Sequence, residues 1–241
     1  MKAKQMITAL TVGFAALALA GAPAMAQSAK PTEQPAADHG KDHKAKDHKM
    51  TKDATKDAGK GVDVGQTAPD FKLKDTDGKE VTLSEYTKAG KTVVLFWFNP
   101  SCPYVVKHFN GDQKTFNDLA AKYKDKNVQV IAINSGAPGN EGAGLEANAK
   151  AKKDWKIGFP ILLDESGTVG KEYGAKNTPF TLVITKEGKV AYEGAIDDDS
   201  TAGKPGKTNY AAKALDEVLA GTSVTTAKTK PYGCSVKYGK N

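Results

Sequence analysis

Residues 93–109, VVLFWFNPSCPYVVKHF, run from a continuous apolar stretch directly into a cysteine. Such a stretch is typical of a β-strand that is buried on both faces of a sheet. Cys102 follows the stretch, and Pro103 suits the first turn of a helix. The segment therefore predicts a strand, a short loop and a helix that begins at a cysteine. Because sites in open α/β sheets form beyond the carboxyl ends of such strands, Cys102 is the first candidate for chemistry.

The sequence on either side predicts an α/β sandwich with a mixed sheet. Upstream, residues 71–83 alternate about Asp77-Gly78, which indicates a β-hairpin. The strands flanking the first downstream helix should be parallel, with a right-handed connection. The remaining expected elements are a helix over 112–123, a buried strand over 128–134, a helix ending near 155, an extended stretch over 159–165, a hairpin over 179–196 and a helix over 209–221.

The first 61 residues predict two segments outside this fold. Residues 1–26 combine a lysine-containing start, an apolar run and Ala24-Met25-Ala26, which is the pattern of a cleaved secretory signal peptide. The apolar run is too short to span a membrane. We therefore expect a periplasmic or secreted protein with no membrane insertion after cleavage. Residues 27–61 are rich in Lys, Asp and His and poor in large apolar side chains, so we expect a disordered tether.

The amino-acid composition bears on whether the protein binds nucleic acid or metal ions. The net charge is +7, and all 35 basic residues are lysines. Because arginine is the usual bidentate reader of guanine and phosphate, we expect no nucleic-acid partner. His39, His43 and His48 each follow an aspartate, which allows weak metal binding as one interpretation. Nothing fixes a ligand geometry there, so we favour a solvated linker and expect neither a metal site nor a cofactor.

Position alone leaves two interpretations of Cys102. At a helix start, unpaired N–H groups and the positive end of the helix dipole favour a reactive thiolate. A buried, inert thiol is the alternative. His108 lies about 240° around a helix from Cys102, so we expect it to pack rather than to act as a base. The glycine-rich loop 135–144 is interpreted as a flexible lip, and the acidic run 196–199 as a solvated loop.

Several strings together resemble a known family. These are VGQTAPDFKLKDTDGKEVTLSEY (64–86), FNPSCPYVVKHF (98–109), YGAKNTPFTLVI (173–184), YEGAIDDD (192–199) and PYGCSVKY (231–238). They are similar to the redoxin and peroxiredoxin-like branch of the thioredoxin superfamily, in particular to exported proteins resembling the alkyl hydroperoxide reductase/thiol-specific antioxidant group. The resemblance implies a thioredoxin-like three-layer α/β/α sandwich with a mixed central sheet and an N-terminal β-hairpin. It implies a domain over 62–221 and a tail over 222–241 that carries Cys234.

The same resemblance implies roles for particular residues. Cys102 matches the second cysteine of a Cys-x-x-Cys motif and the peroxidatic cysteine of peroxiredoxins. Cys234 is then a possible resolving partner. The implied neighbours of the active cysteine are Trp97, Asn99, Pro103 and the cis-proline loop at Thr178 and Pro179.

This chain also departs from the family pattern. Asn99 stands where Cys-x-x-Cys proteins have their first cysteine, which excludes ordinary dithiol exchange within one motif. Leu95 stands where peroxiredoxins have a proline before the peroxidatic motif. Peroxiredoxins also use an arginine to polarise peroxide, and a lysine supplies charge without the planar fork. Efficient peroxidase activity is therefore not expected.

Two functions remain open from the sequence. One is a thiol oxidoreductase in which a peroxide or a protein disulfide oxidises Cys102, and Cys234 closes a disulfide. The other is a catalytically weak binding module in which a Cys102–Cys234 bond is a static brace. Both contain this disulfide, because these are the only two cysteines of the chain and an oxidising compartment favours the bond. Closing so long a loop contributes roughly 5 kcal/mol in the chain-entropy account.

Overall fold

The computed structural model describes residues 61–112 and 114–239. The chain divides into two units, Met1–Lys49 and Met50–Asn241, and every described residue belongs to the second. The expected signal peptide and all but the last residue of the expected tether, with its three histidines, lie outside the described residues. Those expectations stay predictions. Within the described part of the chain, no helix is long and apolar enough to cross a membrane.

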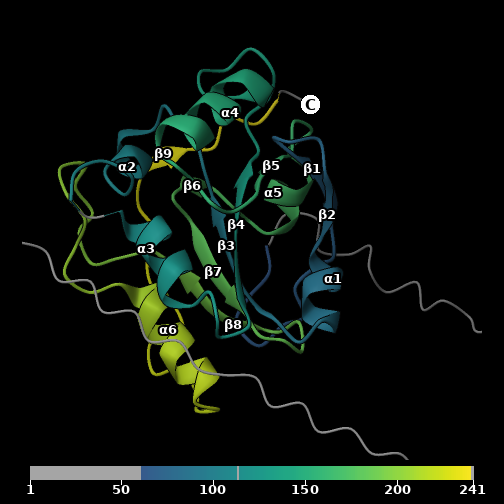
Figure 1. Ribbon diagram of the computed structural model, residues 1–241, viewed down its shortest axis with the longest axis vertical. Helices are drawn as coiled ribbons and strands as arrows, with labels where there is room; N and C mark the ends of the chain where they lie inside the picture. The colour runs from purple at the N-terminus through teal and green to yellow at the C-terminus, as the bar shows by residue number, and fades with distance from the viewer. Residues whose placement is uncertain (1–60, 113, 240–241) are drawn as a thin grey trace, which may run out of the picture. The chain divides into compact units, whose positions relative to one another are not determined.

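A seven-stranded sheet in the order β2-β1-β5-β4-β3-β7-β8 forms the centre of the fold (Figure 1). Strands β3, β4 and β5 are parallel, whereas β7 pairs antiparallel with β3 and β8 pairs antiparallel with β7. The hairpin of β1 and β2 joins the sheet antiparallel to β5. The strands are β1 Lys72–Asp75, β2 Glu80–Thr82, β3 Thr92–Trp97, β4 Val128–Asn134, β5 Ile161–Leu163, β7 Thr181–Ile184 and β8 Val190–Gly194. The mixed sheet with an N-terminal hairpin is thus confirmed.

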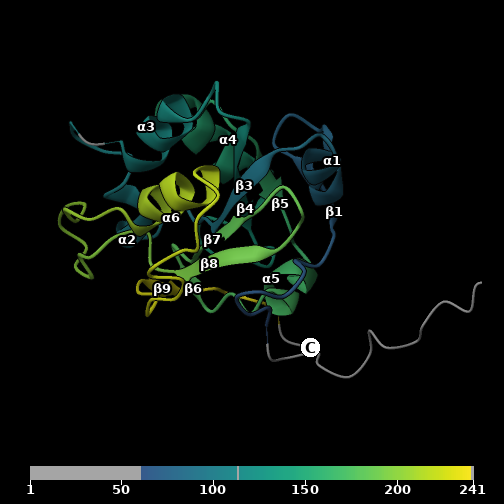
Figure 2. The same cartoon turned by 90° about the horizontal axis from the view of Figure 1, so that it is seen from below.

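Helices cover both faces of the sheet (Figure 2). One apolar cluster packs β3 and β4 against α3, α4 and α6, and a second cluster packs the opposite face against α1 and α5. The result is the expected three-layer arrangement. The helices are α1 Leu83–Lys88, α2 Pro103–Val106, α3 Thr115–Lys122, α4 Gly144–Asp154, α5 Thr168–Glu172 and α6 Tyr210–Leu219.

Strand β3 explains why its sequence reads as one apolar run. All six of its residues are buried, because successive side chains point into the two different clusters. Phe96 lies in the cluster under α3, where its ring stacks on Phe116 with 3.7 Å between the ring centroids. Trp97 points to the opposite face. The strand therefore anchors both layers and fixes where the chain leaves the sheet towards Cys102.

Helix α3 starts later than the sequence indicated. Asp112, where the helix was expected to begin, lies outside it, and Lys114 occupies the N-cap position. The carboxylate of Asp118, in the first turn, accepts a hydrogen bond from the Lys114 backbone N–H at 3.0 Å. This contact satisfies a backbone donor at the end of the helix. Helix α6 begins where the sequence predicted, and Asn209 caps it by accepting from the Ala212 N–H at 2.8 Å.

Truncating Phe96 tests the packing of the central strand. Phe96→Ala should lower the free energy of unfolding by about 3–5 kcal/mol, because it removes a fully buried ring from between two layers. Leu145→Ala is the matched control, since Leu145 is 53% exposed and its truncation should change stability by only about 0.5 kcal/mol. Denaturant unfolding measures both. A loss below about 1 kcal/mol for Phe96→Ala would contradict this packing.

Candidate active site around Cys102 and Cys234

Cys102 sits at the point where the chain turns from the end of β3 into helix α2. It occupies the N-cap position of α2, and Pro103 is the first residue of the helix, as expected. Its backbone N–H donates to the carbonyl of Asn99 at 3.1 Å, which closes the connecting turn. The side chain is 3% exposed. Helix α2 has only four residues, so few aligned peptide dipoles act on the thiol.

The cis-proline loop faces this cysteine. The Thr178-Pro179 peptide bond is cis, as the resemblance implied. The thiol of Cys102 donates a hydrogen bond to the carbonyl oxygen of Thr178, with 3.3 Å between sulfur and oxygen. Two segments 76 residues apart in the chain are thereby brought into contact at the sulfur.

The C-terminal tail completes the site through a second, two-stranded sheet. Strand β9, Cys234–Ser235, pairs antiparallel with β6, Asn177–Thr178, and places Cys234 opposite Thr178. Gly233 lies so close to the loop that a Cβ atom there would stand 2.0 Å from the Thr178 carbonyl oxygen. Its φ of 113° is also unfavourable for any residue with a side chain. Both features require glycine immediately before the second cysteine.

Both cysteines are free thiols in this structure, so the Cys102–Cys234 disulfide stays a prediction. The structure nevertheless brings the two side chains together. Burial, and after it a hydrogen bond with the Cys102 side chain, raises the pKa of the Cys234 thiol to about 12. Cys234 is therefore protonated at neutral pH. Because the thiolate is the nucleophile, Cys234 is a poor first attacking group.

Asn99 connects the cysteine turn to the glycine-rich loop. Its side-chain oxygen accepts from the Ser101 N–H at 2.8 Å, and its side-chain nitrogen donates to the Glu141 carbonyl at 3.1 Å. A Cβ atom on Gly142 would stand 2.0 Å from the same Asn99 oxygen, so this glycine is required for the close approach. Asn99 thus has a bracing role in this turn.

The glycine-rich loop is more firmly held than the sequence indicated. The buried side chain of Asn134 donates to the Gly142 carbonyl at 2.7 Å, and its oxygen accepts from the Gly136 N–H at 2.8 Å. The Ala137 N–H donates to the Lys237 carbonyl at 2.9 Å. The interpretation as a flexible lip was wrong, because buried amide groups and the tail fix the loop along its length.

Trp97 supports the site from the other face of the sheet. Its ring is fully buried between Tyr173 and Phe180, with ring centroids 5.5 and 5.8 Å away. Its indole N–H donates to the Ser135 hydroxyl at 3.0 Å. The side chain therefore packs beneath the cis-proline loop, in the cluster opposite to the one that holds Cys102.

A buried polar cluster next to α2 did not emerge from the sequence. Lys107 follows α2 with a fully buried side chain, and its ammonium group donates to the carbonyls of Asp199 at 2.5 Å and Thr201 at 2.9 Å. It lies 3.8 Å from the carboxylate of Asp197. Burial lowers the pKa of Lys107, and Asp197 opposes this shift. The same carboxylate accepts from the Tyr232 hydroxyl at 2.5 Å.

The interpretation of residues 196–199 as a solvated loop was wrong for Asp197. This residue is only 2% exposed. Besides Lys107 and Tyr232, the Gly206 N–H donates to it at 2.6 Å. A carboxylate with these three partners is stable in the interior, whereas an unpaired one is not. Its neighbour Asp198 is exposed, as expected.

His108 packs in this cluster and does not serve Cys102. Its ring is fully buried, with Nδ1 3.0 Å from the Thr115 hydroxyl and Nε2 3.1 Å from the Tyr232 hydroxyl. Because the Tyr232 proton goes to Asp197, the neutral ring carries its own proton on Nε2. Both nitrogens are thus engaged away from the thiols, which confirms the expectation of a packing role. Burial lowers the pKa of His108 to about 4.

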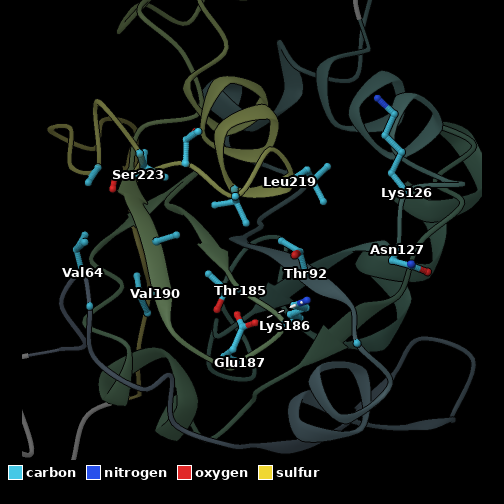
Figure 3. Close-up of a pocket in the computed structure, with 18 residues that line it drawn as sticks. Val64, Thr92, Lys126, Asn127, Thr185, Lys186, Glu187, Val190, Leu219 and Ser223 are labelled. Atoms are coloured by element: carbon cyan, nitrogen blue, oxygen red, sulfur yellow. Dashed lines mark ion pairs between the residues drawn. The ribbon is translucent and has the colours of Figure 1, made fainter.

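A groove of the described domain lies away from the thiols. It has a volume of about 790 Å³ and is lined partly by Thr92, Asn127 and Leu219 (Figure 3). Thr92 is the first residue of β3, whereas Cys102 follows the other end of that strand. The groove is therefore no part of the cysteine site. Among the described residues, no group of three or more His, Cys, Asp or Glu is arranged to hold a metal ion.

Comparisons with known proteins agree with this geometry. Residues 64–193 match the AhpC/TSA family. Relatives include the thiol-disulfide oxidoreductase ResA of Bacillus thuringiensis, 30% identical over 135 residues that cover 55% of this chain and 69% of the relative. The chloroplastic peroxiredoxin Q of Triticum aestivum is 34% identical over 142 residues, which cover 54% of this chain and 58% of that protein. A redoxin-type thiol chemistry is thus supported, and the resemblance seen in the sequence is confirmed.

Two solved structures extend the likeness over most of the chain. A hypothetical protein from Sinorhizobium meliloti 1021 has a TM-score of 0.66 and 29% identity, covering 75% of this chain and 97% of its own. An uncharacterized conserved protein from Geobacillus kaustophilus has a TM-score of 0.66 and 32% identity, covering 74% and 94%. The family match ends at residue 193, so Cys234 lies beyond it.

His108 should make stability depend on pH. The unfolded chain binds a proton on this residue near the ordinary pKa of 6.5, whereas the folded chain resists protonation down to about 4. Lowering the pH through this window therefore favours unfolding, by up to about 3 kcal/mol from this residue. His108→Gln, which keeps a hydrogen-bonding side chain without this titration, should lose less stability between pH 6.5 and 4. Urea unfolding across the window measures both proteins, and equal slopes would contradict a buried neutral His108.

Proposed function

Because this chain belongs to the AhpC/TSA family, we propose that it is an exported thiol–disulfide oxidoreductase of the redoxin type. Cys102 is the first attacking thiol and Cys234 is the resolving thiol. The observation that supports this proposal is the pairing of β9 with β6. It sets Cys234 opposite Thr178, the residue whose carbonyl oxygen binds the Cys102 thiol.

The order of attack follows from the surroundings of the two thiols. Burial and the adjacent Cys102 hold Cys234 in its protonated form. The hydrogen bond and the charge of Cys102 contribute to this raised pKa, and both disappear once the Cys102 sulfur has entered a covalent bond. Oxidation of Cys102 therefore makes Cys234 easier to deprotonate at the moment when it is needed.

With a partner disulfide, the reaction has two exchange steps. The Cys102 thiolate attacks one sulfur of the partner, forms a mixed disulfide and releases the partner's other sulfur as a thiolate, which takes up a proton. Cys234 loses its proton and attacks the Cys102 sulfur, which releases the partner's second thiol. The net result is one disulfide in this protein and two thiols on the partner.

When the oxidant is a peroxide, the same two thiols react, but the first step is different. The Cys102 thiolate attacks a peroxide oxygen, breaks the O–O bond and becomes a sulfenic acid, while the other oxygen leaves as an alcohol or water. Cys234 then condenses with the sulfenic acid and releases water. The only cation in the buried cluster beside α2, Lys107, is engaged by Asp197 and two carbonyl groups. We therefore propose that this step is slow.

The burial of Cys102 bears on the second function that the sequence left open. Cys102 is 3% exposed, and the tail strand lies across the cis-proline loop that faces it. A disulfide this well covered resists reduction, and the domain would then be a binding module braced by a static bond. In both functions the bond is the same, so the ease of its reduction separates them.

Oxidised glutathione tests the assigned order of attack. In the reduced mature protein it should produce the Cys102–Cys234 bond, identified by peptide mapping without reductant. In Cys234→Ser the reaction should stop with glutathione attached to Cys102, because no resolving thiol is present. Cys102→Ser is the matched control and should react slowly at Cys234, because burial, the largest cause of the raised pKa of that thiol, remains in this variant. Fast modification of Cys234 in that control, or an unmodified Cys102 in Cys234→Ser, would overturn the assignment.

Reduction of insulin tests the consequence of Asn99. The wild-type protein should reduce insulin much more slowly than a Cys-x-x-Cys thioredoxin at equal concentration, because the second thiol comes from the covered tail. Asn99→Cys creates a Cys-x-x-Cys motif and should raise the rate. Turnover by the wild-type protein equal to that of a thioredoxin would show that the tail cysteine exchanges freely, contrary to this proposal.

A further inference from the structure

We propose that the buried cluster of Lys107, His108, Asp197 and Tyr232 holds the tail so that Cys234 lies against Cys102. We call these four residues the tail anchor. Within it, Tyr232 is the positioning residue for closure of the disulfide. This inference rests on the proposed function and names the residues that make its second step efficient.

The contacts of Tyr232 lead back to the segment that carries Cys102. Tyr232 precedes Cys234 by two residues. Its ring lies 6.2 Å from the ring of Tyr104, and the Lys107 ammonium group stands 4.6 Å from its centroid. The Nε2 atom of His108 lies 3.1 Å from its hydroxyl. All three partners belong to α2 or to the two residues after it, so Tyr232 ties the tail to the helix that begins at Cys102.

Asp197 ties the same tyrosine to the rest of the fold. It lies shortly after β8, whose last residue is Gly194, and it accepts the Tyr232 hydroxyl at 2.5 Å. Lys107 stands 3.8 Å from the same carboxylate oxygen. A hydrogen bond to a buried charged group is stronger than one between neutral groups. Tyr232 is therefore fixed by a charged partner that is itself held in place.

The segment between the tail anchor and Cys234 is short and held by contacts. Gly233 is the only residue between Tyr232 and Cys234, and it already lies against the Thr178 carbonyl. Beyond Cys234, the Val236 N–H donates to the Lys176 carbonyl at 3.0 Å, and the Tyr238 hydroxyl donates to the Ala175 carbonyl at 2.5 Å. Strand β9 itself has only two residues. Contacts on both sides therefore hold Cys234. The contacts of Tyr232 lead to the helix that begins at Cys102, the cysteine with which Cys234 reacts.

Fixing both thiols raises the effective concentration of one at the other. A tail free to move spends part of its time with Cys234 away from Cys102, which disfavours the disulfide. The tail anchor removes these arrangements before oxidation occurs. Loosening it should therefore weaken disulfide closure and expose the Cys234 thiol, while leaving the sheet and its two apolar clusters in place.

Tyr232→Phe tests this inference in the full mature protein. It removes the hydroxyl that binds Asp197 and His108 and keeps the ring above Lys107. Tyr123→Phe is the matched control, because the buried Tyr123 also donates its hydroxyl to a carboxylate, that of Asp216 at 2.7 Å. Tyr123 directly follows α3 and Asp216 belongs to α6, and the hydrogen bonds and ion pairs of these two residues involve no member of the tail anchor.

Two readouts compare these variants with the wild-type protein. The first is the alkylation rate of each cysteine by iodoacetamide in the fully reduced protein, which we expect to rise several-fold at Cys234 in Tyr232→Phe alone. The second is the equilibrium constant for Cys102–Cys234 closure in glutathione buffers. We expect it to fall about tenfold in Tyr232→Phe, which corresponds to a rise in reduction potential of about 30 mV, and to stay unchanged in Tyr123→Phe.

The two readouts separate this inference from the proposed function. Unchanged alkylation and closure in Tyr232→Phe overturn the positioning role while the redox function stands. Equal effects in Tyr123→Phe also overturn it, because they show general loosening of the fold. If no disulfide forms in the wild-type protein but Cys234 becomes reactive in Tyr232→Phe, the anchor stands and the redox function fails. Should Tyr232→Phe not fold, Asp197→Asn, which keeps an acceptor oxygen and removes the charge, gives the same two measurements.

Discussion

The carbonyl oxygen of Thr178 is the point on which the arrangement of the cysteines depends. It accepts the hydrogen bond of the Cys102 thiol at 3.3 Å. The same residue pairs with Cys234 in the two-stranded sheet. The oxygen also lies where a side chain at Gly233 would have to be. The Thr178 backbone thus fixes the position of the Cys102 thiol and the strand register of Cys234. It also requires glycine at the position before Cys234.

The buried charges of Lys107 and Asp197, beside α2, help to place the tail in this arrangement. Burying an ammonium group and a carboxylate costs free energy that their attraction only partly offsets, so such a pair is weak support for a purely stabilising role. The side chains of Lys107 and Asp197 are buried. The Lys107 ammonium group lies over the Tyr232 ring, and the Asp197 carboxylate accepts a hydrogen bond from the Tyr232 hydroxyl. Their directional contacts select one position for the tail, which apolar packing alone would leave less defined. Positional specificity close to Cys234 is the property that a resolving thiol needs.

Much of the fold could be predicted from the sequence, because its signals are local and periodic. The apolar run of β3 and the Asp77-Gly78 turn each indicate an element within a few residues. The cis-proline loop and the role proposed for Cys102 followed from resemblance to a family. The β6–β9 pair could not be predicted, since strands of two residues carry no periodicity. The pairing of Lys107 with Asp197 joins positions 90 residues apart and leaves no local pattern, so Asp197 read as one more acid in a solvated run.

Equilibration of the mature protein in graded glutathione buffers shows whether Cys102 and Cys234 form a reversible redox pair. The fraction of the Cys102–Cys234 bond at each potential is read by thiol labelling and peptide mapping. A reversible pair should show a two-electron transition at a potential above about −300 mV, where exchange with cellular thiols is possible. A bond that persists to potentials below about −300 mV would identify a static brace, and two free thiols throughout would show that the bond does not form; either result excludes a reversible redox pair.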